Sequence, residues 1–177
     1  MPAERELADL VLADRLPMGQ VREAVTATLA EGIELIELYD VWLGAPPLAA
    51  SIAAADYRVE IEGDVDPAEL ERAAAGVMAA GSLPRRRARG EATIEYDLRP
   101  LVDRIEVIDS GVSIRSLFDP SRGAGRPEEV VATLGELVGR ELVVRAITRE
   151  RLILADELEP RQSDAGRCRA PRCRAPG

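Results

Sequence analysis

The sequence predicts an α+β fold, and three observations in residues 56–155 carry this prediction. Strand-like runs, in which apolar and charged residues alternate, are interspersed with helical patterns, in the order strand, helix, strand, strand, helix, strand. The alternation is typical of an antiparallel sheet with one solvated face. Each helical pattern has a proline near its start and a glycine near its end. This order predicts one complete ferredoxin-like βαββαβ unit at residues 56–155.

The elements of this unit can be assigned one by one. The first strand begins at Tyr57, and the helix that follows begins at Asp66-Pro67, with Asp66 as the N-cap, and ends near Gly81. The second helix runs from Pro127 to a stop near Gly139. The other strands are expected at residues 92–98, 105–108, 112–117 and 142–154, the last as one strand or a bent pair.

Residues 5–47 predict the C-terminal part (βαβ) of a second, similar unit. An apolar run at residues 7–12 and another at residues 33–43 are compatible with strands, and Leu16-Pro17 opens a helix between them. The alanine-rich residues 48–55 are expected to form a connector, with a short helix as one option. A half-unit cannot cover its own apolar face, so we expect self-association through residues 1–50. The simplest interpretation is an N-terminally truncated chain.

Composition limits the function. The chain of 177 residues is 46% hydrophobic and only 3% aromatic, and its net charge is −9. An acidic chain repels nucleic acid unless its basic residues gather on one face. No apolar run approaches the roughly 20 residues that span a bilayer. The only cysteines, Cys168 and Cys173, lie in an Arg/Pro/Cys tail at residues 160–177 that we expect to be disordered, which makes a cytoplasmic location the expectation.

Three strings, in this order along the chain, resemble the bacterial radical SAM-linked protein family. They are Tyr39-Asp40-Val41-Trp42-Leu43-Gly44-Ala45-Pro46-Pro47-Leu48, Ala55-Asp56-Tyr57-Arg58-Val59 and Tyr96-Asp97-Leu98-Arg99-Pro100-Leu101. The family is a domain of unknown function that accompanies a radical SAM enzyme. The resemblance therefore implies an accessory or substrate-handling role with a radical SAM protein as partner. The chain departs from the family by lacking histidine, and so lacks the family's first Ser-His-Leu-Asp run.

The densest cationic run contains Arg85, Arg86, Arg87 and Arg89. Guanidinium groups bind phosphate oxygens bidentately, so this run is a candidate contact for phosphate or RNA. The competing interpretation is a solvated loop that leads into a strand. The second interpretation is favoured, because the aromatic residues on which single-stranded nucleic acids stack are missing nearby.

Two further motifs are candidates for partner binding or for structure. Asp97 and Arg99 are either a functional carboxylate–guanidinium pair at a strand end or a structural pair, and structure is favoured. Trp42, followed by two prolines, is either a docking residue or a core residue that fills the seam between the two units, and the core is favoured.

The sequence predicts no catalytic residue, no metal site and no cofactor. Cys168 and Cys173 lack the further ligands of a zinc or iron–sulfur site, and Gly123-Ala124-Gly125-Arg126 lacks the lysine of a phosphate-binding loop. We therefore expect a non-catalytic accessory or substrate-presenting module for a radical SAM enzyme. The alternative is an RNA-binding module in RNA modification that uses the Arg85–Arg89 run.

Overall fold

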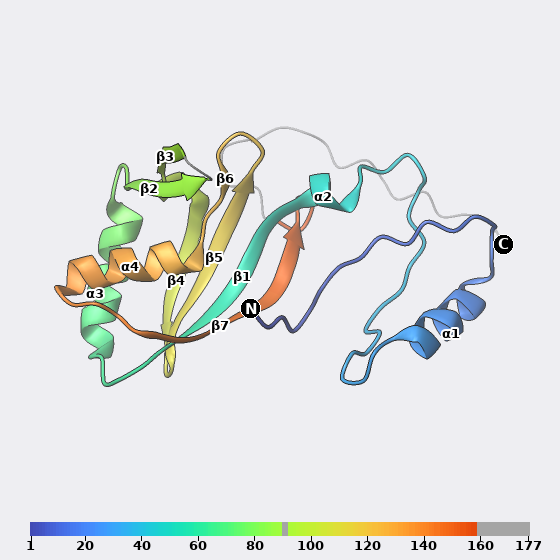
Figure 1. Ribbon diagram of the computed structural model, residues 1–177, viewed down its shortest axis with the longest axis horizontal. Helices are drawn as coiled ribbons and strands as arrows, with labels where there is room; N and C mark the ends of the chain where they lie inside the picture. The colour runs from blue at the N-terminus through green and yellow to red at the C-terminus, as the bar shows by residue number, and fades with distance from the viewer. Residues whose placement is uncertain (90–91, 159–177) are drawn as a thin grey trace, which may run out of the picture.

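The computed structural model describes residues 1–89 and 92–158. The described chain is a mixed α+β body, which begins at residue 48, and an N-terminal segment of residues 5–47, called the arm below. Figure 1 shows the arm reaching away from the body, with one helix at its far end. The fold class predicted from the sequence is thus confirmed at the level of an α+β protein with an antiparallel sheet.

The body is built on a sheet in which every neighbouring pair of strands is antiparallel. Its strands are β1 (Ile52–Ile61), β4 (Val102–Ile108), β5 (Gly111–Asp119), β6 (Gly123–Ala124) and β7 (Val144–Leu154). The long strands follow the order β4-β5-β1-β7, and the short β6 pairs with the end of β5. The central strand β1 therefore pairs with β5 on one side and β7 on the other, while β5 and β7 are not paired with each other.

Two helices, α3 (Pro67–Ala79) and α4 (Pro127–Val138), pack on one face of this sheet (Figure 1). The Asp66 side chain caps α3 by accepting a hydrogen bond from the main-chain N–H of Ala68 at 3.0 Å. Gly139 ends α4 with a φ of 83°, a left-handed conformation that favours glycine. Both helix ends thus follow from sequence signals.

The core lies between the helices and the inner face of the sheet. The helices contribute mostly aliphatic side chains, and alternate residues of β1 and β5 complete the core, because side chains of a strand point to opposite faces in turn. Its most deeply buried members are Val59, Val77, Leu98, Val102, Val112, Ile114, Val130 and Leu134. The other residues of the same strands form a charged open face.

The body begins earlier than expected, and the predicted connector at residues 48–55 is wrong in its second half. Only α2 (Leu48–Ser51) is helical there, and β1 begins at Ile52. Ala54 and Ala55 are fully buried, and Ala54 lies opposite Leu117 on β5. An alanine-rich run is compatible with a helix. In this chain the small alanine side chains fit the buried middle of the sheet, and this packing makes the segment a strand.

The arginine run does not form the expected loop. It forms β2 (Pro84–Arg89), which pairs with β3 (Ala92–Asp97) in a separate two-stranded sheet between α3 and β4. A short 3₁₀ turn, η1 (Arg99–Leu101), connects this hairpin to β4. The strand forms because each residue of the run has a partner on β3, from Arg85 opposite Tyr96 to Arg89 opposite Ala92.

In the arm, the helix forms as α1 (Met18–Thr28), but the strands expected at residues 7–12 and 33–43 are not formed. The sheet of the body suggests why. There the strands on either side of the second helix, β5 and β7, both pair with β1 and not with each other. Residues 7–12 and 33–43 flank α1 in the same way, and no described strand lies between them to supply their hydrogen bonds. The expected disordered tail at residues 160–177, with both cysteines, lies outside the described residues.

Candidate functional site

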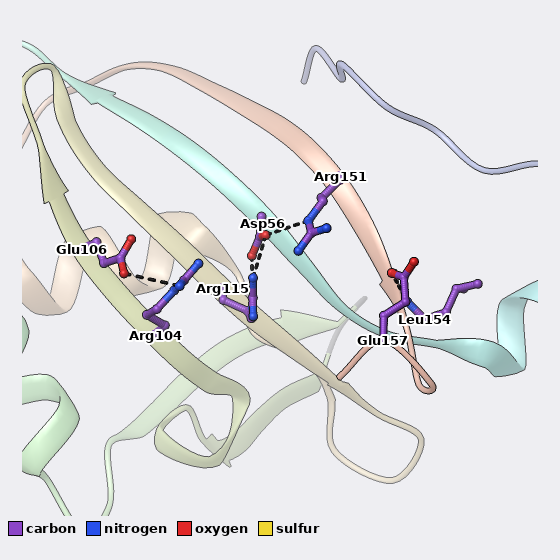
Figure 2. Close-up of polar contacts among 7 residues, drawn as sticks. All are labelled: Asp56, Arg104, Glu106, Arg115, Arg151, Leu154 and Glu157. Carbon is purple, nitrogen blue, oxygen red and sulfur yellow. Dashed lines mark hydrogen bonds and ion pairs between the residues drawn. The ribbon is translucent and has the colours of Figure 1, made fainter. Parts of the chain in front are cut away.

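A cluster of three charged residues lies on the open face of the sheet. Asp56 on β1 stands directly opposite Arg115 on β5 and Arg151 on β7. Arg115 donates from Nε and Nη2 to the two Asp56 carboxylate oxygens at 2.7 and 3.0 Å, and Arg151 donates from Nε at 3.1 Å. Figure 2 shows both guanidinium groups turned toward the single carboxylate.

Asp56 is only 8% exposed, and its environment favours the charged form. Burial by itself would raise the pKa of this carboxyl group. The hydrogen bonds and the positive charges of Arg115 and Arg151 outweigh that effect, so that the pKa of Asp56 lies below its ordinary value. A carboxylate with a lowered pKa and three donors is held as an anion and is poorly suited to act as a general acid.

The neighbourhood of this cluster is also paired. On the same face Arg104 on β4 approaches Glu106 at 3.4 Å, and Arg58 on β1 forms ion pairs with Glu150 at 2.8 Å and with Glu4. Opposite charges alternate over the face, so no excess of one sign builds up there to attract a charged ligand. The arrangement acts as a cross-strand clamp that joins β5, β1 and β7.

The side chains of Asp97 and Arg99 bind main-chain groups instead of pairing with each other. The Asp97 carboxylate accepts from the N–H groups of Leu83 at 2.7 Å and Arg99 at 3.0 Å, which lowers its pKa. The Arg99 guanidinium donates to the carbonyls of Met78 at the end of α3, at 3.0 and 3.2 Å, and of Val102 at 2.7 Å. Leu98, between them, is fully buried. This geometry fastens the β2–β3 hairpin to α3 and β4.

Neighbouring side chains of the arginine run point to opposite faces of β2. Arg85 points inward and donates from Nη2 to the Thr133 hydroxyl at 2.7 Å and to the Glu136 carboxylate at 2.8 Å, both on α4. Arg86 points outward and pairs with Glu95 across the hairpin at 2.7 Å, with 76% of its side chain exposed. The side chains of Arg87 and Arg89 lie outside the described part. Two of the four predicted phosphate contacts are therefore already engaged by carboxylates.

Trp42 does not fill a seam between two units. It is 80% exposed, and it stands in a turn in which the Ala45 N–H donates to the Trp42 carbonyl at 2.8 Å. The indole ring lies over Gly44, where an added Cβ would come within 2.3 Å of it. The prediction of a core position is wrong, because the arm has no second apolar layer in the described chain to receive the ring.

The arm is fixed to the body at both ends. Just before its start, the Glu4 N–H donates to the Arg149 carbonyl at 2.9 Å, and the Arg149 N–H donates to the Pro2 carbonyl at 3.0 Å. Glu6 pairs with the Arg149 side chain at 2.7 Å. At its end the Leu48 N–H donates to the Asp9 carboxylate at 2.9 Å. The arm therefore leaves the body next to β7 and returns to it just before β1.

Sequence reasoning missed the Asp56 cluster as a site. Asp56 is a polar residue within a strand start that is otherwise buried, between Ala55 and Tyr57, and this was the available signal. Its partners lie 59 and 95 residues away in sequence, so the register was needed to find them. Within residues 1–89 and 92–158, no group of three potential metal ligands is present. No helix in that part of the chain is long and apolar enough to cross a membrane.

Comparison with known proteins gives one match. A family model described as an uncharacterized protein conserved in bacteria (DUF2344) matches residues 1–127, which include the arm, β1 to β6 and the Asp97–Arg99 motif. No curated protein and no solved structure matches the chain.

Proposed function

Because the chain belongs to the bacterial DUF2344 family of uncharacterized proteins, we propose its function from its own surfaces: it is a non-catalytic accessory module that docks on a radical SAM enzyme and presents substrate to it. The observation that carries this proposal is the arm. It holds twelve of the fifteen exposed large hydrophobic residues in the described chain, including Trp42. Exposed apolar surface of this extent is typical of a protein–protein contact, where tryptophan is often a hot spot.

The radical SAM partner rests on the three sequence strings that resemble the radical SAM-linked family. Two of them now have a physical role. Asp56 joins three strands, and Asp97 with Arg99 fastens the hairpin. The third string contains Trp42 and is exposed, which leaves it available to a partner.

We further propose that residues 52–154 form a ferredoxin-like unit with the β2–β3 hairpin as an insertion. The strand order β4-β5-β1-β7, the antiparallel pairs and the two helices on one face support this assignment. A cytoplasmic location also belongs to the proposal, since residues 1–158 contain no cysteine and need no oxidising compartment.

The test is complex formation between purified proteins. Each radical SAM protein encoded in the source genome is reconstituted anaerobically, mixed with the chain, and analysed by size-exclusion chromatography with light scattering. We expect a stoichiometric complex with one of them, which Trp42→Ser and Leu43→Ser weaken at least tenfold. The matched control is Leu137→Ser with Val143→Ser, the two exposed large hydrophobic residues in the described part of the body.

The RNA-binding alternative predicts a different result. Single-stranded RNA would then bind with an affinity that falls steeply with salt, and replacing Arg87 and Arg89 by serine would reduce that slope. Failure of all radical SAM proteins to bind, together with this salt-dependent RNA binding, would replace the accessory function by the RNA-binding one.

A further inference from the structure

The arm has one covered side and one uncovered side. Val21 on α1 is 8% exposed, and Val25, Leu29, Leu35 and Leu38 are half-buried, so these residues form the covered side. The uncovered side includes a run after α1 whose exposed fractions range from 55% to 99%. Its members are Ile33, Ile36, Tyr39, Val41, Trp42 and Leu43. An apolar surface of this kind remains in contact with water unless another molecule covers it.

The main chain of the same run is also unpaired. Residues 34–41 make no hydrogen bond to any described residue through their main-chain groups, whereas the flanking turns are closed by Ile33 N–H to Ala30 and Ala45 N–H to Trp42. A segment with free N–H and C=O groups and an apolar side can add a neighbouring strand. The run therefore offers both side-chain and main-chain contacts to an occupant.

We propose that this occupant is the arm of a second copy of the chain, in an isologous arm-to-arm dimer. The area agrees with this proposal. Large side chains bury on the order of 150–250 Å² each when they are aromatic, and the six exposed residues together offer several hundred Å². A stable interface needs roughly 800 Å² per partner, and the arm has six further exposed large hydrophobic residues, between Leu7 and Met18, that can add to this area.

The described body exposes far less apolar surface than the arm. Outside residues 1–43, the exposed large hydrophobic residues of the described chain are Leu137 and Val143, which stand near the end of α4. The open face of the sheet is covered by paired charges. In a solution of this chain alone, most of the exposed apolar surface that one arm can meet therefore belongs to another arm, and a two-fold axis satisfies both at once.

Charge gives this dimer a distinctive signature. Residues 1–47 contain nine acidic residues and three arginines, which is a net charge of −6. Glu34, Glu37 and Asp40 lie within the uncovered run itself. Two arms that meet through apolar residues also bring these charges together, and salt screens their repulsion. The dimer is therefore tightened by salt, whereas an interface held by ion pairs or phosphate contacts is weakened by it.

This inference does not depend on the radical SAM partner, because it concerns the chain alone. It also adds regulation to the proposed docking, since the dimer covers the surface that an enzyme would use. Loss of enzyme binding would leave the dimer unaffected, and a chain that stays monomeric would leave the enzyme test open to either result.

The experiment is sedimentation velocity on the full chain from 1 to 100 µM, at low and at high sodium chloride. We expect a monomer–dimer equilibrium whose dissociation constant decreases at least threefold at high salt. The variant Ile36→Ser, Trp42→Ser, Leu43→Ser should raise that constant at least tenfold. The control Leu137→Ser with Val143→Ser should leave it unchanged, and circular dichroism checks that both variants keep the fold of the body.

Several results would overturn the proposal. These are a chain that stays monomeric at 100 µM, a dimer that the triple arm variant leaves intact, and a dimer that salt weakens. Growth beyond the dimer with concentration would also contradict it, because a closed two-fold contact leaves no free arm.

Discussion

Asp56 and Arg115 are direct cross-strand partners, and the guanidinium of Arg115 spans both oxygens of the Asp56 carboxylate at 2.7 and 3.0 Å. Arg151 approaches the same carboxylate from the other neighbouring strand. Three strands are therefore joined through one side chain that is 12% exposed. A cluster of this kind is costly to break from one side, because the remaining charges keep no partner.

We predict that Asp56→Ala lowers the free energy of unfolding by roughly 2–3 kcal/mol, the scale of charged hydrogen bonds lost in a mostly buried setting. Urea denaturation followed by circular dichroism measures this change. Glu60→Ala, on the same strand and the same face, is the matched control and should cost within about 0.5 kcal/mol. Equal effects of the two changes would show that the Asp56 clamp contributes nothing specific.

Because of Asp56, we also predict that the free energy of unfolding decreases at acidic pH. The pKa of Asp56 in the folded chain lies below its ordinary value, so the stability that it contributes is complete above that ordinary value. This contribution is lost as the pH falls through the lowered pKa and Asp56 becomes protonated. The difference in unfolding free energy between wild type and Asp56→Asn should therefore be constant from pH 7 to pH 5 and decrease below pH 4. A difference that increases toward acid would contradict the sign.

Replacing Arg85 should lower the free energy of unfolding more than replacing Arg86. Arg85→Ser removes hydrogen bonds to Thr133 and Glu136 and should cost roughly 1–2 kcal/mol, because the guanidinium is mostly covered. Arg86→Ser removes an exposed ion pair with Glu95 and should cost within about 0.5 kcal/mol. Thermal and urea unfolding of the two single variants measure this contrast. Identical values would mean that the inward direction of Arg85 has no energetic consequence.

How far the sequence predicts this molecule can be seen in particular residues. Local sequence signals predict the helix ends correctly, because neighbouring residues alone determine them: Asp66-Pro67 begins α3, and Gly139 ends α4. Local signals fail where the conformation depends on a segment that is distant in sequence. The alternation in residues 33–43 is compatible with a strand, but a strand needs a neighbour, and the described chain has none there.

The candidate site shows the same division. The string that contains Asp97 and Arg99 was visible in the sequence, but the acceptors of Arg99, the Met78 and Val102 carbonyls, could not be read from it. The pairing of Asp56 with Arg115 depends on strand register over 59 residues, which periodicity does not supply. Its size favours a core position for Trp42, but the second layer that such a core requires is missing from the described chain.

The last prediction concerns the independence of the body. Of the buried hydrophobic residues, Val21 is the one that lies before residue 54 among those described. The core of the body thus receives no side chain from the arm, and residues 1–47 contact the body mainly through Pro2, Glu4 and Glu6. A fragment of residues 48–158 should therefore fold cooperatively, with a single urea transition and dispersed amide signals in NMR spectra.

The fragment also separates the two parts of the chain in the self-association experiment. It should remain monomeric at concentrations at which the full chain forms dimers, because it lacks the apolar run and most of the exposed hydrophobic residues. A start at residue 57 should be less stable, since it deletes Ala54 and Ala55, which are fully buried between β5 and β7. A molten fragment at residues 48–158, with a broad urea transition, would show that the arm is part of the folding unit and that the division of the chain at residue 48 is wrong.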